Sequence, residues 1–333
     1  MAAPVSATKS WGYLATHTLE RLRPVIADNV TGRIFLLHAL RERGVEVNVP
    51  GGLEIVLPVF KELQTAEAYS DLDVLSVSRA DPTTVARSQW KQLAVPLMIS
   101  GRDMAINMGE TTRVLSVLQT MVNSATLSLR EGLANSTTGI FSALGDSDKG
   151  ITGLQTILTH TSSSTPTSGT VAGLSRATYT FWRNQVANVS SDFSANGYTQ
   201  MHTLYAACTR GDETPDIVVL TRNTYVNFVI NATGTFNYNV PLTGRAGALD
   251  VGFSEVTFLG ALVGFDDYCP ANNGYFINSK YLHYVVHPDR NIEIGEFKAP
   301  TNQDALVSHA LWMGNVVPSN MGRHGLLLNG DTN

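Results

Sequence analysis

Charged side chains are scarce in this chain of 333 residues. Asp, Glu, Lys and Arg make up 15% of it, against about a quarter in an average soluble domain. Basic residues do not dominate, since the formal net charge is −5. A general nucleic-acid coat needs basic patches that displace counterions, so the composition argues against one. Much of the surface must be neutral and polar, which suits extensive contact between proteins.

Cysteine and long apolar runs are scarce as well. The two cysteines, Cys208 and Cys269, form no C-x-x-C pair and lie near no histidine cluster, so we expect two buried thiols. No run reaches the roughly 18 apolar residues that span a bilayer. The N-terminal segment lacks the basic-then-apolar layout of a signal peptide. We therefore expect no membrane partner and a protein made and used in a cytoplasm.

The common sequence signatures of catalysis are missing. There is no Walker A sequence, no G-x-G-x-x-G after an expected strand and no G-x-S-x-G. His283 and His287 share one face of an expected strand with Asp289 nearby, but no third ligand stands at metal-binding spacing. We interpret the two histidines as polar positions on an exposed sheet face rather than as metal ligands.

Paired acids do not indicate an active site either. Glycoside hydrolysis needs two carboxylates across a cleft, and nothing indicates a cleft at Asp71 and Asp73 or at Asp266 and Asp267. The sequence thus predicts no enzyme, with no catalytic residue, no cofactor site and no metal ligand. Three tryptophans that could stack on sugars or bases lie within apolar patterns and are expected in the core or in an interface: Trp90, Trp182 and Trp312.

Apolar periodicity predicts an α+β fold. Helical spacing occurs over 12–44, 196–209 and 221–234, and most clearly over 107–135. Residues 216–220 predict a short buried strand, and the last hundred residues contain most of the other expected strands. Because helices and strands are segregated along the chain instead of alternating regularly, we predict the α+β class. The stripe of the long helix comprises Val114, Leu118, Met121, Val122, Ala125, Leu129 and Leu133.

Two proline-bearing extended segments flank a polar stretch. Residues 47–60 and 88–101 both alternate, whereas residues 61–87 show no sustained periodicity. We predict that the two segments pair as a long projection over 50–100. An isolated two-stranded hairpin is marginally stable in water, so its apolar face should lie on another subunit. That face comprises Leu93, Val95, Leu97 and Ile99.

The order of these parts resembles that of a known family. An N-terminal helical segment is followed by PGGLEIVLPV, a polar hairpin, WKQLAVPLMISGRDMAINMGE and the long helix. Later come GTVAGLSRATYTFWRNQV, DIVVLTRNTYVNF and NQDALVSHALWMGNVVPSNMGRHGLLL. Across almost the whole chain this order is similar to that of the major capsid proteins of tailed double-stranded DNA phages, which have the Hong Kong 97-like fold.

The resemblance implies a division into four parts. The N-terminal arm would cover 1–49, the projecting E-loop 50–100, the peripheral domain with its spine helix 101–150 and 291–317, and the axial domain 151–290 and 318–333. Residues 298–305 would match the family's loop near the local three-fold contact. The candidate contacts between subunits are Trp90, Leu93, Val95, Leu97, Ile99, Lys298, Asn302, Gln303 and Asp304.

The function implied is that of a shell subunit. Copies would form hexamers and pentamers that enclose phage DNA without binding it specifically, in a virion assembled in the host's bacterial cytoplasm. Because the arm begins close to Met1, we expect a separate scaffolding protein, together with a portal; a decoration protein stays open. Some relatives cross-link Lys to Asn, but Lys61, Lys91, Asn302 and Asn315 supply only the residue types, so we predict no cross-link.

Two alternatives remain open from the sequence. One is the shell protein of an encapsulating compartment with the same fold, filled with a cargo enzyme in place of DNA. The other belongs to a different class, namely a cytoplasmic hydrolase or carbohydrate-binding protein whose loops at 61–87 and 159–170 would line a site. The first would still form shells, whereas the second would be a compact monomer or small oligomer.

Overall fold

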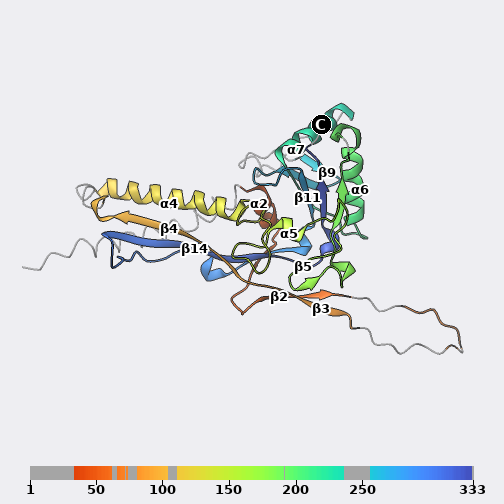
Figure 1. The fold of residues 1–333 in the computed structure, drawn as a ribbon, viewed down its shortest axis with the longest axis horizontal. Helices are drawn as coiled ribbons and strands as arrows, with labels where there is room; N and C mark the ends of the chain where they lie inside the picture. The colour runs from red at the N-terminus through yellow and green to blue at the C-terminus, as the bar shows by residue number, and fades with distance from the viewer. Residues whose placement is uncertain are drawn as a thin grey trace, which may run out of the picture.

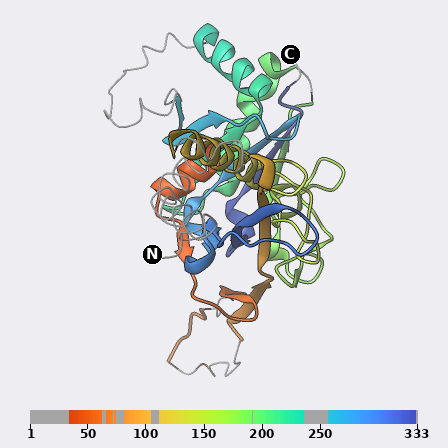
Figure 2. The same ribbon diagram turned by 90° about the vertical axis from the view of Figure 1, so that its left-hand side faces the viewer.

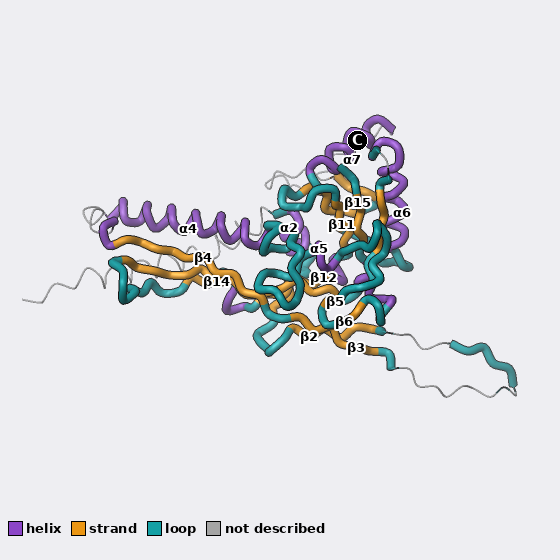
Figure 3. Tube along the Cα trace, viewed as in Figure 1, coloured by secondary structure: helices purple, strands orange, loops and turns teal. Residues whose placement is uncertain are grey.

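The computed structural model describes residues 34–61, 66–71, 73, 81–103, 111–190, 192–235 and 256–331, with the backbone alone at 111–118 and 232–235. A central body carries two projections (Figures 1 and 3). One, here called the wing, contains α4 (Thr111–Ala134), β4 (Lys91–Ser100) and most of β14 (Ala305–Pro318). The other, here called the hairpin, contains β2 (Ile55–Phe60) and β3 (Thr83–Ser88). The two projections extend from the body in different directions.

The wing is built on the long strand β14, which belongs to a five-stranded sheet. Beyond the body, β14 pairs antiparallel with β4 from Ala305↔Ser100 to Gly314↔Lys91. Within the body it pairs antiparallel with β12 (Leu282–Val286), which in turn pairs parallel with β1 (Glu46–Asn48). The short strand β13 (Glu293–Ile294) completes the sheet against β14. One strand thus connects the wing with the body.

Helix α4 covers one face of the wing sheet, and Figure 1 shows it running alongside β4. Within its described side chains, the apolar residues at positions 122, 125, 129 and 133 are buried, as the helical spacing predicts. Gly132 of α4 lies next to β4, since a Cβ there would be in ordinary contact, at 4.0 Å, with a methyl of Leu93. The predicted long helix is therefore confirmed, with bounds of 111–134 in place of 107–135.

A six-stranded mixed sheet forms the other layer of the body, in the order β7-β15-β11-β8-β10-β9. Its central strand β8 is buried at every position, which confirms the predicted buried strand at 216–220. Helices α6 (Tyr198–Cys208) and α7 (Arg222–Thr235) pack against this sheet (Figure 2). The remaining strands are β7 (Gln185–Asn188), β9 (Val256–Phe258), β10 (Ala261–Phe265), β11 (Asn273–Ile277) and β15 (Gly325–Leu328).

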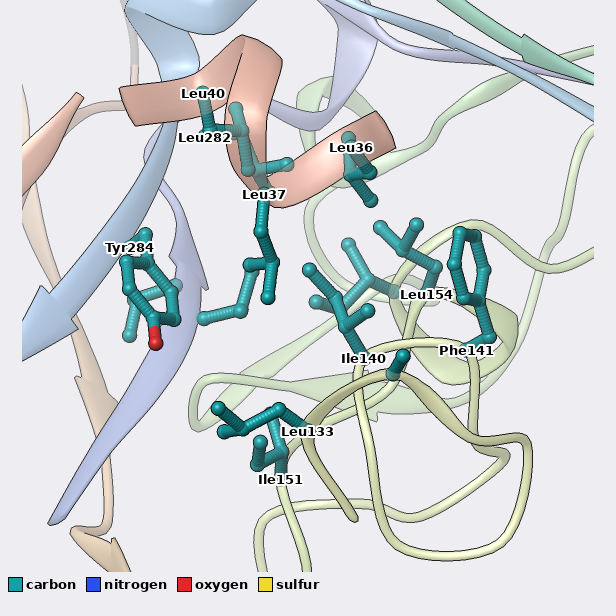
Figure 4. Packing of buried hydrophobic residues seen from close by; sticks show 14 of the residues in the cluster. Leu36, Leu37, Leu40, Leu133, Ile140, Phe141, Ile151, Leu154, Leu282 and Tyr284 are labelled. Carbon is teal, nitrogen blue, oxygen red and sulfur yellow. The ribbon is translucent and has the colours of Figure 1, made fainter. Parts of the chain in front are cut away.

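Helix α2 (Phe35–Glu42) lies in the largest hydrophobic cluster of the body. Figure 4 shows Leu36, Leu37 and Leu40 of this helix facing side chains from the segment that follows α4 and from β12. The helix ends at Glu42, and Gly44, two residues further on, has a φ of +69°, a conformation that glycine adopts readily after a helix. The part of the predicted 12–44 helical region within the described residues is thus confirmed; the rest lies outside them.

Short elements connect the two layers. They are α5 (Leu154–Ile157), the two-stranded β5 (Thr170–Val171) and β6 (Leu174–Ser175), a π turn at Phe193–Gly197, and 3-10 turns at Thr180–Trp182, Ser279–Tyr281, Pro288–Arg290 and Met321–Arg323. The segregation of helices from strands confirms the α+β class. Within the described part of the chain, no helix is both long and apolar enough to span a bilayer.

The hairpin differs from the predicted one in its returning strand. β2 pairs with β3, from Ile55↔Ser88 to Phe60↔Thr83, whereas the segment expected to return, β4, pairs with β14. The predicted pairing of the segment 47–60 with the segment 88–101 is therefore wrong, apart from the contact of Ile55 with Ser88. The physical reason is burial: in the wing sheet Leu97 and Ile99 are 3% and 1% exposed, a burial that a free two-stranded projection would not give them.

Candidate assembly surfaces

The two faces of the hairpin differ in burial. Residues directly opposite each other in an antiparallel pair share a face, so the register places Ile55, Val59 and Ala86 on one side. These side chains are 2%, 4% and 0% exposed. Because they reach the body's hydrophobic cluster, the base of the hairpin is held by the chain's own core.

The opposite face of the hairpin is open; it is apolar along β2, while β3 adds Thr83 and Arg87 beside Val85. Val56, Phe60 and Val85 are 53%, 75% and 40% exposed, and the exposed Pro58 lies between them on β2. Large apolar side chains grouped on one exposed face of a projecting element are typical of a protein-protein contact. We name this set the hairpin's outer face: Val56, Pro58, Phe60 and Val85.

The wing sheet also has an uncovered face, opposite α4. Ala94, Pro96 and Met98 of β4 are exposed there, Met98 by 55%. The β4–β14 register places half-buried Val307 and Leu311 of β14 on the same side. The same pairings place the exposed His309 opposite Pro96, Glu293 opposite Leu311 and the exposed Lys298 opposite Val307 on this side. The apolar members of this side are here named the wing's outer face: Ala94, Pro96, Met98, Val307 and Leu311.

The β4 residues that we expected to contact another subunit contact this chain instead. Leu97 and Ile99 are buried, and Leu93 and Val95 are half-buried against the main cluster. The expectation that this face is free to cover a neighbour is wrong, because α4 and the body already cover it. The alternate side of the same strand is the exposed one.

Trp90 likewise makes its contacts within the chain. Its indole Nε1 donates a hydrogen bond of 3.0 Å to the carbonyl of Gly52, and its ring lies edge-on to that of His287, with 5.9 Å between centroids. The tryptophan therefore connects the two strands at the base of the hairpin. Its expected role as a contact between subunits has no support from this position.

The expected three-fold loop lies at the far end of the wing. Lys298, Asn302, Gln303 and Asp304 are all exposed, and the carbonyl of Asp304 accepts a 2.8 Å hydrogen bond from the Gly101 amide. These four residues are accessible to a neighbouring molecule. Whether they contact a second subunit stays a prediction.

The residue types for a Lys–Asn cross-link fall into two groups. Lys91 and Asn315 are 3% and 0% exposed, and both make hydrogen bonds inside the chain, so neither could reach a neighbouring subunit. Lys61 and Asn302 are exposed. The structure thus leaves only these two with access to a neighbour.

The histidines and the first acid pair considered as metal ligands or catalytic groups do not form a common site. His283 is half-buried and lies 3.1 Å from the hydroxyl of Ser319, while His287 contacts Trp90. Asp73 accepts a 2.8 Å hydrogen bond from the amide of Ser70, within its own turn. Among the described residues, no group of three His, Cys, Asp or Glu side chains could hold a metal ion.

The second acid pair lies beside a small cavity of about 210 Å³. Asp267 forms an exposed ion pair with Arg222, and burial raises the pKa of Asp266 to about 6. Backbone amides of Tyr268, Leu36 and Phe35 hydrogen-bond the Asp266 carboxyl and oppose that rise. Asp266 therefore serves the docking of helix α2, and a catalytic pair is not formed.

The two cysteines are buried and free, as predicted. Cys208 is fully buried, and burial raises the pKa of its thiol to about 12. Trp182 and Trp312 are core residues at 0% and 1% exposure. The tryptophans were expected in the core or in an interface, and these two lie in the core. Buried protonated thiols are poor nucleophiles, so neither cysteine is suited to chemistry.

Sequence reasoning missed the outer face of the hairpin. Residues 53–60 have apolar side chains on both sides of the strand, with Ile55, Leu57 and Val59 on one and Val56, Pro58 and Phe60 on the other. The sequence therefore already showed that both faces of this strand are apolar. A strand that is apolar on both sides must either lie in the middle of a core or contact something outside the chain.

Comparison with solved structures finds phage capsids. The capsid of cyanophage A-1(L) matches with a TM-score of 0.59 and 13% identity, covering 88% of this chain and 93% of that one. The capsid of an empty GTA particle matches at 0.56 and 14%, covering 86% and 88%. A chain of Mycobacterium phage Ogopogo matches at 0.51 and 14%, covering 87% and 91%.

Neither a protein-family model nor a curated protein matches the sequence. The similarity is thus one of fold, over most of the length of both chains. The chain has the fold of the tailed-phage major capsid proteins, which confirms the fold expected from the order of its segments.

Proposed function

We propose that this chain is the major capsid protein of a tailed phage, a structural subunit that assembles into the shell around the genome. The observation that carries the proposal is the exposed apolar side chains on the outer faces of the hairpin and of the wing, in a chain with a capsid fold. The large apolar side chains exposed there are Val56, Phe60 and Val85 on the hairpin and Met98 on the wing, and exposed apolar groups of this kind mark contact surfaces. A shell of many copies would cover both.

The two outer faces suit a head-to-tail contact. They belong to different projections of the molecule (Figure 1), so the hairpin of one copy can lie on the wing of the next while its own wing receives another hairpin. Such heterologous contacts generate closed rings when the rotation between copies closes. Hexamers and pentamers, the expected units of an icosahedral shell, are rings of this kind.

The energetics of the hairpin support the same arrangement. Ordering a backbone costs about 1–2 kcal/mol per residue, and a two-stranded element has little core of its own. Covering Phe60, Val56 and Val85 would contribute about 25 cal/mol per Å² of apolar surface removed from water. A neighbouring subunit is the partner that could supply this burial all around a closed shell.

We assign the parts of the fold with one revision. The arm at 1–49, the axial domain at 151–290 and 318–333, and the segment 291–317 of the peripheral domain stay as the resemblance implies. The E-loop is shortened to 50–90 because β4 pairs with β14, and the peripheral domain then begins at 91. The long helix α4 takes the place of the spine helix.

The remaining partners follow from the shell proposal. We propose a scaffolding protein and a portal as partners, assembly in a bacterial host, and enclosure of DNA without specific binding. The net charge of −5 supports the last point, since specific or tight DNA binding needs accumulated phosphate contacts. The described exposed face of α4 is also almost uncharged, with Gln119, Asn123, Ser124 and Ser128.

Sedimentation and electron microscopy of the expressed chain, alone and with the proteins encoded beside it, test the proposal. We expect ring-sized capsomers or closed shells, and nuclease-protected DNA in particles from a complete phage. A well-folded monomer that stays monomeric at high concentration would rule out a shell protein of either kind. Shells that contain an enzyme in place of DNA would instead identify the encapsulating compartment.

A further inference from the structure

The hairpin joins the wing through three consecutive residues, 89–91, which we call the joint. β3 ends at Ser88 and β4 begins at Lys91, so the joint must turn the chain from one projection into the other. Each of its residues makes a hydrogen bond to a distant segment. The carbonyl of Gln89 accepts from Asn315 Nδ2 at 2.9 Å, and Trp90 Nε1 donates to the carbonyl of Gly52 at 3.0 Å.

The third residue of the joint, Lys91, has a buried ammonium group without a side-chain carboxylate as its hydrogen-bond partner. Its Nζ donates to the backbone carbonyls of Gly145 at 3.3 Å, of Asp146 at 2.7 Å, and of Asp148. Burial lowers the pKa of Lys91, and the nearby carboxylates of Asp146 and Asp148 oppose that change. Three donors thus meet three acceptors, and the ammonium holds the loop 145–148 in one shape.

The same loop extends back to the hairpin. The Asp146 carboxylate accepts a 2.7 Å hydrogen bond from the amide of Ala172, and the carbonyl of Ala172 accepts one of 2.8 Å from the amide of Arg87 on β3. Lys91, Asp146, Ala172 and Arg87 therefore form a closed circuit around the end of β3. This circuit fixes β3 relative to β4 from two sides.

The outgoing side of the hairpin is held before β2 at the carbonyl of Gly52, which accepts the hydrogen bond from Trp90 of the joint, and within β2 by the buried side chains of Ile55 and Val59. Gly51 and Gly52 precede β2 with φ values of +144° and +125°, a region that glycine alone adopts without strain. Backbone rotation is therefore easy on the outgoing side. The joint holds the outgoing side through Trp90 and the returning side through Gln89 and Lys91, so the bonds that can set the direction of the hairpin converge there.

We propose that Lys91, through the loop 145–148, is the positioning residue that fixes the direction of the hairpin relative to the wing. Given the shell proposed above, on which this consequence rests, the direction of the hairpin sets the angle between neighbouring copies. Loss of the buried ammonium would then produce shells of mixed size. The orientation itself is a property of the single subunit and can be measured without assembly.

Spin labels at Thr83→Cys on β3 and Asn302→Cys at the wing tip measure this orientation by pulsed electron resonance in dilute, unassembled subunits. Both sites are exposed, whereas the native thiols are buried and should not take label. Lys91→Met keeps the length and apolar stem of the side chain and removes the ammonium. Lys149→Met is the matched control, because Lys149 follows the same loop and is exposed.

We expect a narrow distance distribution in the parent protein and in Lys149→Met, and a broadened or shifted one in Lys91→Met. An unchanged distribution in a folded Lys91→Met would overturn the inference, even if the parent protein forms perfect shells. If Lys91→Met does not fold, Asp146→Ala removes the carboxylate that accepts the bond from Ala172, at a half-buried position. A broadened or shifted distance distribution in Asp146→Ala would then support the inference, and an unchanged one would overturn it. A parent protein that never assembles would refute the shell proposal and leave the orientation result standing.

Discussion

Asp331 caps helix α7 from a distant part of the chain. Its carboxylate Oδ1 accepts hydrogen bonds from the amide of Thr224 at 3.1 Å and from the Thr224 hydroxyl at 2.7 Å, and also from the Thr221 hydroxyl. The other oxygen, Oδ2, accepts from the amide of Asn272 at 2.7 Å. The first turn of a helix has free amides and a partial positive charge, and Asp331 accepts from one of these amides, that of Thr224.

Replacing Asp331 by Ala should lower the free energy of unfolding of the subunit by about 1–2 kcal/mol, as for the loss of an N-cap. Urea unfolding of the unassembled subunit measures this. Burial raises the pKa of Asp331, but the hydrogen bonds from Thr221, Thr224 and Asn272 outweigh it and leave the pKa below its ordinary value. The stabilisation is therefore present at neutral pH and is lost as the pH falls through that lowered pKa.

Asp267→Ala provides the matched control for Asp331→Ala. Asp267 also lies beside the start of α7, but its ion pair with Arg222 is exposed on both sides. Exposed pairs of this kind contribute about 0–1 kcal/mol, so this variant should unfold nearly like the parent. Equal losses of unfolding free energy in the two variants would show that the hydrogen bonds of Asp331 stabilise the subunit no more than an exposed ion pair does.

A buried histidine should make the subunit sensitive to acid. His324 is fully buried, accepts a 3.3 Å hydrogen bond from the Asn278 amide, and has a pKa lowered to about 4, mainly by burial. The unfolded chain binds this proton near pH 6.5 and the folded chain only near 4. Stability is therefore complete above pH 6.5 and falls as the pH drops toward 4, by up to about 3 kcal/mol.

His324→Asn should flatten this pH dependence while lowering stability at pH 7, and the exposed His160→Asn should leave it in place. Asp266 acts in the opposite direction, because its raised pKa of about 6 means that protonation at lower pH stabilises the fold. The measure is therefore the difference between variant and parent in urea unfolding from pH 7 to 4. A difference that stays constant over this range would contradict the assignment to His324.

Gly264 makes room for the docking of helix α2. A Cβ at this position of β10 would lie 2.3 Å from the ring of Phe35, so Gly264→Ala should destabilise the subunit by about 1–3 kcal/mol through overpacking. At Gly295 the nearest atom to an added Cβ is 3.8 Å away, and Gly295→Ala should be close to neutral. Adding Phe35→Leu to Gly264→Ala should restore part of the loss, which a double-mutant cycle in urea quantifies.

The sequence predicted the helices and strands themselves better than it predicted which strands pair with each other. The long helix and the strand at 216–220 were identifiable because apolar spacing reports which face of an element is buried. That spacing does not say what covers the face, so β4 was paired with β2 although β14 is its partner. The joint shows why: Asn315 holds the carbonyl of Gln89 across 226 positions of sequence, and no local pattern records such a contact.

The outer face of the hairpin provides the sharpest test of assembly. Phe60→Asp changes a side chain that is 75% exposed in the subunit, so its unfolding free energy should barely change. In the proposed shell the same side chain is covered, and burying an unpaired carboxylate there is costly. We therefore expect Phe60→Asp, and Val56→Asp at 53% exposure, to abolish or strongly reduce shells seen by sedimentation and electron microscopy.

Two controls separate contact from folding in that experiment. Thr203→Asp adds the same charge at an exposed position of α6 and should assemble normally. Val59→Asp, one residue before Phe60 but 4% exposed, should unfold the base of the hairpin and lower the stability of the isolated subunit. Normal shells from Phe60→Asp would mean that the outer face is not a contact, because an unpaired charge could not remain in a covered apolar interface without loss of assembly.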